Sequence, residues 1–233
     1  MESIFKEFLD WSEVWAVLIP FIVYIIKKPR QKFLKPVFIY LCVALFLNVL
    51  IDLVWKGKHY YEAEFKEYIP RFFWSNNFIY NIHSACRLFL FLWFFEKLNF
   101  HPTKLKNSIV VLISFGLIII NFSFYQSFKN FSNTLFAFEG IILLIYSLSY
   151  FLYIIKKDEV NTAFNPSLFI VTGLALYEAV SFSIFLFHDA LTVQNPGFSI
   201  AIWKVHDYVF IVLCLFFAKA FYGERKPVMP VYE

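Results

Sequence analysis

One apolar segment near the middle of the chain carries a row of side chains suited to binding a ligand or transferring a proton. Asn76, Tyr80, His83 and Arg87 follow one another at steps of four, three and four residues, which stacks them on one face of an α-helix. Arginine pairs with anionic groups, and histidine binds metals or exchanges protons near neutral pH. This face therefore indicates ligand binding, metal binding or proton transfer.

Residues in other apolar segments are the candidate partners of this face. Glu139 and Glu178 lie in two later segments, and the last segment contributes His206 and Asp207. A charge at mid-membrane costs about 2.5–3.5 kcal/mol, so four lipid-facing groups would cost about 10–14 kcal/mol. That cost is comparable with a domain's whole net stability of about 5–15 kcal/mol. We expect a shared polar interior, with candidate ligand-binding residues Asn76, Tyr80, Asn81, His83, Arg87, Glu139, Glu178, His206 and Asp207.

The elements that must position these residues are membrane-spanning helices. Hydrophobic residues make up 60% of the chain and charged residues 16%, against about 25% charged in soluble proteins. Polar backbone groups in hydrocarbon must be paired within their own segment, which favours helices. The sequence predicts an all-α polytopic membrane protein, with residues 1–233 forming one bundle of seven transmembrane helices. The expected spans are about 11–27, 36–55, 72–95, 107–125, 131–155, 167–188 and 198–221.

The distribution of basic residues predicts how this bundle is oriented. Thirteen Lys and Arg residues flank one set of span ends, and seven flank the opposite set. The positive-inside rule then puts the C-terminus in the cytoplasm and the N-terminus outside the cell (inner) membrane. Because the net charge of +4 reflects this signal, it indicates no nucleic-acid partner. Most of the polar candidates fall in the outer half, so we expect an outward-opening cavity bounded by the second, third, fifth, sixth and seventh spans.

Three functions from different classes fit such a cavity. In a sensor or receptor, Arg87 would pair an anionic group of a small polar or amphiphilic ligand, and Glu139 or Glu178 would hold a cation or a hydrogen-bond donor. Rearranged helices would then signal to a cytoplasmic partner. In a transporter, the same residues and His83 would form a proton or ion relay, although the chain shows no inverted repeat. We favour the sensor, and the hydrolase described next is the runner-up.

The third function is hydrolysis of a lipid at a metal centre. A zinc ion held by His83, His206, Asp207 and one Glu would activate water. However, the chain has no H-x-x-x-H or H-E-x-x-H spacing, and the adjacent His206 and Asp207 diverge by about 100° on a helix. The sequence therefore predicts no metal site and leaves the cofactor unknown.

Structural roles are the alternative for every candidate. Arg87 with Glu139 or Glu178 would be a buried ion pair that only fixes helix packing, and the asparagines would join helices. Glu13 and Lys204 are expected to be solvated near the membrane interface.

Small residues inside the spans indicate packing. Gly116, Gly140 and Gly173 mark possible close contacts between helices. The three cysteines, Cys42, Cys86 and Cys214, are expected to behave as small apolar side chains.

Two short runs carry a resemblance to a known group of proteins, Asn76-Asn77-Phe78-Ile79-Tyr80-Asn81-Ile82 and Phe138-Glu139-Gly140-Ile141-Ile142. The chain resembles small bacterial seven-helix membrane proteins, which are similar to sensor modules found ahead of signalling domains. The resemblance implies the seven-helix architecture and assigns no functional residue.

Overall fold

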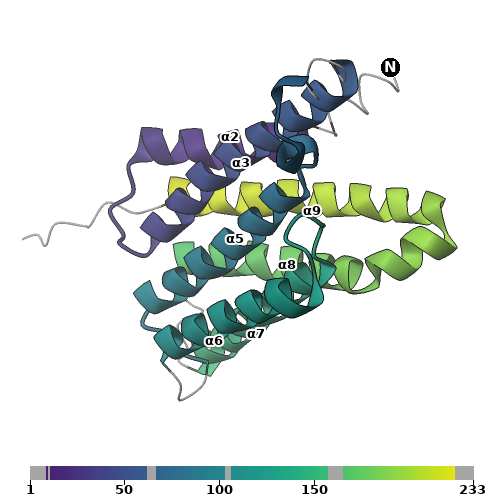
Figure 1. Ribbon diagram of the computed structural model, residues 1–233. Coiled ribbons are helices and arrows are strands. Elements are labelled where there is room, and N and C mark those ends of the chain that lie inside the picture. The colour runs from purple at the N-terminus through teal and green to yellow at the C-terminus, as the bar shows by residue number, and fades with distance from the viewer. Residues whose placement is uncertain (1–8, 10, 62–66, 103–105, 157–164, 224–233) are drawn as a thin grey trace, which may run out of the picture.

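The computed structural model describes residues 9, 11–61, 67–102, 106–156 and 165–223, and the secondary structure of this part consists of helices without strands (Figure 1). The long helices are α2 (Ser12–Lys27), α3 (Leu34–Tyr60), α5 (Asn77–Lys97), α6 (Asn107–Ile120), α7 (Asn133–Lys156), α8 (Pro166–Gln194) and α9 (Pro196–Tyr222). A short 3₁₀ helix, η1 (Arg71–Trp74), precedes α5, and a π-helical turn, η2 (Asn121–Tyr125), continues α6. The all-α prediction is confirmed for these residues.

Six of the described helical stretches are long and apolar enough to cross a membrane, so the chain is a multi-pass membrane protein. They are Leu34–Tyr60, Asn77–Lys97, Asn107–Tyr125, Asn133–Lys156, Pro166–His188 and Ala201–Tyr222. The seventh predicted span is not confirmed. Helix α2 has 16 residues, which reach about 24 Å, less than the roughly 30 Å of a hydrocarbon core. It ends where Lys28 adopts a left-handed conformation with φ 48°.

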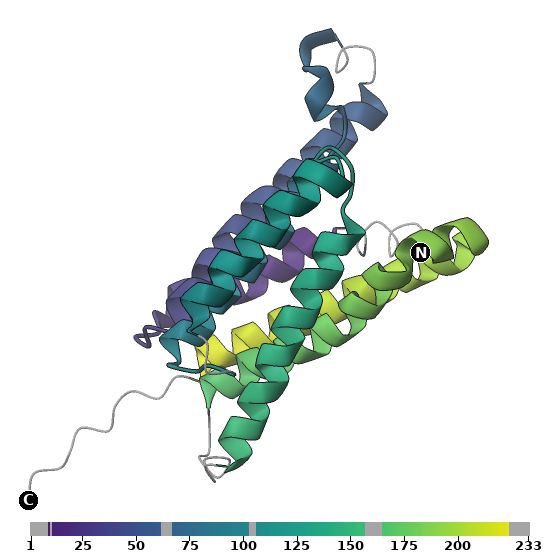
Figure 2. The same cartoon turned by 60° about the horizontal axis from the view of Figure 1, so that its bottom comes forward.

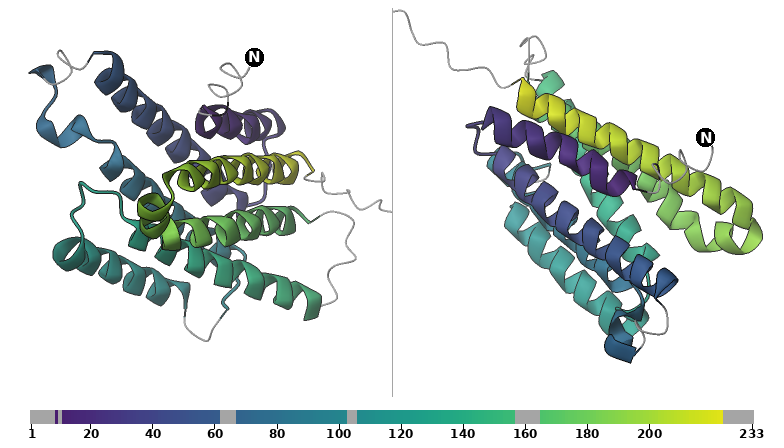
Figure 3. Two further views of the ribbon diagram at one scale, coloured as in Figure 1. Left: turned by 90° about the vertical axis from the view of Figure 1, so that its right-hand side faces the viewer. Right: turned by 90° about the horizontal axis from the view of Figure 1, so that it is seen from above.

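Six helices form a closed ring, which we call the helix ring. Helix α2 packs against α3, α3 against α5, α5 against α7, α7 against α8, α8 against α9, and α9 returns to α2. Helix α6 lies outside the ring against α5, and Leu112, Ile113 and Phe115 on its surface are exposed. The α8–α9 hairpin diverges from α3 and α6 towards its turn (Figures 2 and 3). The ring order, which the sequence does not reveal, determines which side chains meet.

Helices α8 and α9 begin with the same N-cap arrangement. Asn165 and Asn195 each precede a proline, and each asparagine side chain accepts a hydrogen bond from a backbone N–H in the first turn, at 3.1 Å. Asparagine is a favoured N-cap, and proline at the next position has a backbone angle suited to a helix start. Two Asn-Pro pairs therefore set where α8 and α9 begin.

Apolar residues fill the end of the helix ring that lies beyond Arg87 along α5. Phe91, Phe94 and Phe95 of α5 are buried there against Leu41 of α3 and Phe217 of α9. The buried polar side chains Asn48, Ser84 and Ser181 lie at Arg87 or towards the opposite end, whereas Asn107, Ser147 and Ser167 are buried among the apolar residues. A closed and mainly apolar core therefore fills one end of the ring, and buried polar side chains lie from Arg87 towards the other end.

Two of the three glycines that the sequence marks as possible helix contacts lie where helices approach closely. A Cβ added at Gly173 of α8 would lie 2.7 Å from Phe216 Cβ of α9. A Cβ at Gly140 of α7 would lie 3.1 Å from Phe182 Cβ and 3.3 Å from Glu178 Oε2, both of α8. At Gly116 nothing lies within 4 Å, so the predicted contact there is wrong, because α6 is outside the ring.

Candidate functional site

Arg87 is at the centre of a buried polar network that joins three helices. Its side chain is almost fully buried, and its Nε donates a hydrogen bond to Oε1 of Glu139 on α7. Its Nη1 donates to the Tyr177 hydroxyl of α8 at 2.5 Å, and its Nε lies 3.6 Å from Oε1 of Glu178 on α8. Both glutamates that the sequence offered as partners therefore meet this guanidinium.

Further hydrogen bonds extend this network to α9. Ser84 Oγ donates to the second Glu139 oxygen at 2.5 Å. The Tyr177 hydroxyl lies 3.3 Å from His206 Nε2, and Ser181 Oγ lies 3.1 Å from His206 Nδ1. We call Arg87, Glu139, Tyr177, Glu178 and His206 the buried network.

The buried network has more acid than base. One guanidinium faces two carboxyl groups, and it makes its direct hydrogen bond to Glu139. Neither oxygen of Glu178 has a hydrogen-bond partner, although both are buried, and Oε2 lies in the space left by the missing side chain of Gly140. Arg87 Nη2 also has no hydrogen-bond partner. Since buried polar groups are normally paired, the network retains bonding capacity that a bound molecule can use.

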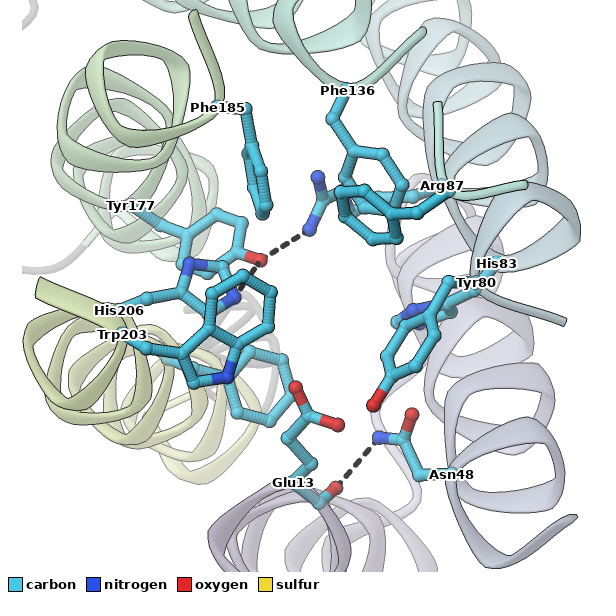
Figure 4. Close-up of a pocket in the computed structure, with 12 residues that line it drawn as sticks. Glu13, Asn48, Tyr80, His83, Arg87, Phe136, Tyr177, Phe185, Trp203 and His206 are labelled. Carbon is cyan, nitrogen blue, oxygen red and sulfur yellow. Dashed lines mark hydrogen bonds between the residues drawn. The ribbon is translucent and has the colours of Figure 1, made fainter. Parts of the chain in front are cut away.

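A small cavity, which we call the chamber, lies against the buried network. Figure 4 shows Arg87 and Tyr177 pointing at each other across it, with Glu13 and Asn48 at its opposite end. All six helices of the ring contribute to the lining residues, which are Glu13, Asn48, Tyr80, His83, Arg87, Phe131, Phe136, Tyr177, Phe185, Trp203, His206 and Phe210. About 10 Å³ is open to the centre of a water-sized sphere, which is room for about one water molecule.

A larger and more open cavity, the vestibule, adjoins the chamber. Its volume on the same measure is about 380 Å³, and its lining residues are Asn76, Asn77, Tyr80, Phe131, Asn133, His188 and Trp203. Tyr80, Phe131 and Trp203 line both cavities, and we call these three residues the neck. The Phe131 ring lies 6.0 Å from Tyr80 and 6.3 Å from Trp203, centre to centre. A ligand entering from the vestibule must pass these rings.

Four of the sequence-predicted site residues line the chamber: Tyr80, His83, Arg87 and His206. His83 stacks on Tyr40 with ring centres 5.9 Å apart, and its Nε2 is buried without a hydrogen-bond partner.

The other predicted residues occupy different places. Glu139 and Glu178 contact Arg87 but are not among the residues that line the chamber. Asn76 lines the vestibule. Asp207 is buried on α9 and lines neither cavity.

Asn81 joins helices and lines neither the chamber nor the vestibule. Its Nδ2 donates to the backbone oxygens of Phe128 and Asn130 at 3.0 and 2.8 Å, and its Oδ1 accepts from the Ser132 backbone N–H at 3.1 Å. The side chain therefore holds the connection between α6 and α7 against α5. This is the structural role that the sequence offered as the alternative to ligand binding.

Sequence reasoning missed Glu13, Tyr177 and Trp203. Glu13 was expected to be solvated, but it lines the chamber because α2 is short and its first turn opens into the ring. Its backbone oxygen accepts a hydrogen bond from Asn48 Nδ2 at 2.8 Å, which ties α2 to α3. Tyr177 precedes Ser181 by four residues, so the two share one face of α8, and both contact His206; this spacing was the available signal for Tyr177.

The described residues contain no group of three or more His, Cys, Asp and Glu side chains that could hold a metal ion. His83 and His206 both line the chamber, but the contacts of His206 are with Tyr177 and Ser181. The zinc hypothesis therefore gains no support from the geometry.

No protein-family model, curated protein or solved structure matches the chain. The resemblance to sensor modules stays a prediction.

Proposed function

We propose that the protein is a sensor-like membrane protein that binds a small polar or amphiphilic ligand in the chamber. The observation that carries this proposal is the Arg87 network, which has unused hydrogen-bonding groups beside a cavity that continues into the vestibule. The apolar core beyond Arg87 closes the other end of the ring. A site with one open end suits binding and release from the same side of the membrane.

The open side is the outer side on this proposal. The excess of Lys and Arg lies at the other ends of the helices, so the N-terminus is outside and the C-terminus is cytoplasmic in the cell (inner) membrane. The ligand then reaches the vestibule from outside or from the outer leaflet.

Binding can act on the whole bundle because every helix of the ring contributes to the chamber wall. A ligand shifts a conformational equilibrium only by its different affinity for the two conformations. Since the chamber holds about one water molecule, a larger ligand must move the neck rings Tyr80, Phe131 and Trp203. The resulting change in helix packing is the signal that a cytoplasmic partner would read.

Proton-coupled transport is the second candidate, and the unpartnered carboxyl of Glu178 favours it. Transport also requires a path through the apolar core around Phe91 and Phe217, which is closed in this structure. Proton uptake into vesicles that Glu178→Gln abolishes would favour transport over sensing.

Ligand-induced stabilisation tests the proposed function. We expect at least one of a panel of small anions, cations, zwitterions and neutral polar compounds to raise the melting temperature of the protein in lipid nanodiscs. A ligand at a hundred times its Kd adds about 2.7 kcal/mol to the free energy of unfolding. Asn76→Trp should reduce the shift by narrowing the vestibule, whereas Leu112→Trp on the exposed surface of α6 should leave it unchanged.

The absence of any shift across the panel, with folded protein at the start, would overturn the proposal. An equal reduction by both tryptophan substitutions would also contradict it, because Leu112 lies far from the vestibule in the fold.

A further inference from the structure

The geometry points to a protonated primary amine as the ligand, with its ammonium group in the chamber and its hydrocarbon part in the neck and vestibule. This inference rests on the proposed function and names the ligand class. Four features of the chamber carry it: charge, hydrogen-bonding groups, aromatic walls and size.

The charged groups around the chamber favour a cation. The positive charge of Arg87 is already shared by Glu139 and Glu178. A third carboxylate, that of Glu13, lines the chamber from α2, and no described cation lies within salt-bridge distance of it. An anionic ligand at Arg87 would increase the negative excess, whereas a cation beside Glu13 would reduce it.

Hydrogen-bond acceptors line the same end of the chamber. Asn48 Oδ1 is buried and has no hydrogen-bond partner, because the Asn48 amide is held with its Nδ2 donating to the Glu13 backbone oxygen. Figure 4 shows the Glu13 carboxylate and the Asn48 amide at this end, beside the Tyr80 hydroxyl. A primary ammonium has three N–H donors for such acceptors, whereas a quaternary ammonium has none.

Aromatic side chains form most of the remaining wall. Seven lining residues are Phe, Tyr or Trp, namely Tyr80, Phe131, Phe136, Tyr177, Phe185, Trp203 and Phe210. Aromatic faces attract cations, by about 2 kcal/mol or more where water is excluded, and tryptophan is the strongest. The combination of a carboxylate with aromatic faces suits a cationic group.

The two cavities fit the two parts of an alkylamine. The chamber has room for about one water molecule, and an ammonium group is about that size. A hydrocarbon stem is thin enough to pass between Tyr80, Phe131 and Trp203 once these rings rotate. The vestibule, at about 380 Å³, then holds the rest of the molecule.

Calorimetric titration of the full chain in phosphatidylcholine nanodiscs tests the inference with four matched probes. Butylammonium should bind, and butyltrimethylammonium should bind at least tenfold more weakly because it lacks N–H donors and is larger. Butyrate and butanol should not bind measurably. If butyrate or butanol binds and butylammonium does not, the amine class is wrong while the proposed function stands. If no probe binds and the wider panel gives no shift, both fail.

Glu13→Gln is the matched variant, since it removes the charge and keeps the size. It should weaken butylammonium binding at least tenfold, whereas Glu96→Gln, which removes an exposed acid at the far end of α5, should not. Trp203→Leu should also weaken binding, and it provides an independent readout if Glu13→Gln fails to fold. Wild-type affinity in both chamber variants would overturn the inference.

A free amine and the headgroup of phosphatidylethanolamine present the same primary ammonium. Nanodiscs that contain phosphatidylethanolamine separate them. Competitive weakening of butylammonium binding would identify the lipid headgroup as the source, and unchanged affinity would identify a free amine.

Discussion

Arg87→Leu is expected to destabilise the protein by about 3–5 kcal/mol, because breaking a buried ion pair leaves its partner charges uncompensated. Glu139 would lose its hydrogen bond from Nε, and Glu178 would lose its nearest cation. The free energy of unfolding in mixed micelles measures the effect. Lys204→Leu removes the same charge from an exposed site on α9 and should change stability by less than about 0.5 kcal/mol.

A compensated variant separates lost charge balance from lost packing. Arg87→Met combined with Glu139→Gln and Glu178→Gln removes the arginine and both carboxylates together. Because all three charges are gone, we expect this variant to recover most of the stability lost in Arg87→Leu. Equal destabilisation by Arg87→Leu and Lys204→Leu would contradict the buried pairing.

Gly173→Ala is expected to destabilise the protein by about 1–3 kcal/mol, the usual range for overpacking. The new Cβ would lie 2.7 Å from Phe216 Cβ, the first atom of a side chain and therefore unable to move without shifting α9. Thermal unfolding of the purified protein checks this expectation.

Gly116→Ala is the matched control, because it makes the same change in α6, where nothing lies within 4 Å. Alanine exceeds glycine in helix stability by about 0.5–1 kcal/mol, so this variant should be as stable as the wild type or more so. A Gly173→Ala variant with the same stability as Gly116→Ala would show that α8 and α9 do not approach as closely as described.

The face of α5 was predictable because four polar residues at helical spacing cannot all point at lipid. Tyr80, His83 and Arg87 do line one chamber. The acidic partners of Arg87 were also predictable, because Glu139 and Glu178 are buried at a depth that Arg87 can reach. That Arg87 meets both of them follows from the order of helices around the ring, and sequence spacing does not contain that information.

The role of Glu13 could not be predicted for a different reason. An acid in the first turn of an apolar segment is normally solvated, and that expectation holds for a helix that reaches the membrane surface. Helix α2 is shorter than the other members of the ring, so its first turn lies beside Asn48 in the interior. The prediction of a seventh full span rested on the apolar composition of this segment. Helix α2 has only 16 residues, which are too few to cross a hydrocarbon core.

Asn81 shows the limit of reading a polar stripe as a binding face. Its position beside the Asn76 row suggested a ligand contact, but its amide is used by three backbone groups of the connection before α7. The conformation of the connection before α7 determines these hydrogen bonds, and a periodic sequence pattern does not predict that conformation.

The proposed function requires that water and small cations reach the chamber inside the helix ring. Thiol reactivity at two positions of α3 tests it, in protein whose native cysteines Cys42, Cys86 and Cys214 are replaced by alanine. Asn48 is buried and lines the chamber, whereas Phe46, two residues earlier, is 67% exposed on the outer surface of the helix. A thiol in hydrocarbon does not ionise and does not react.

The measurement is the rate at which 2-aminoethyl methanethiosulfonate modifies each variant in lipid vesicles. We predict that Asn48→Cys is modified, while Phe46→Cys stays unreactive. Modification of Phe46→Cys with an unreactive Asn48→Cys would overturn the proposed function, because it would place water outside the ring and none within it.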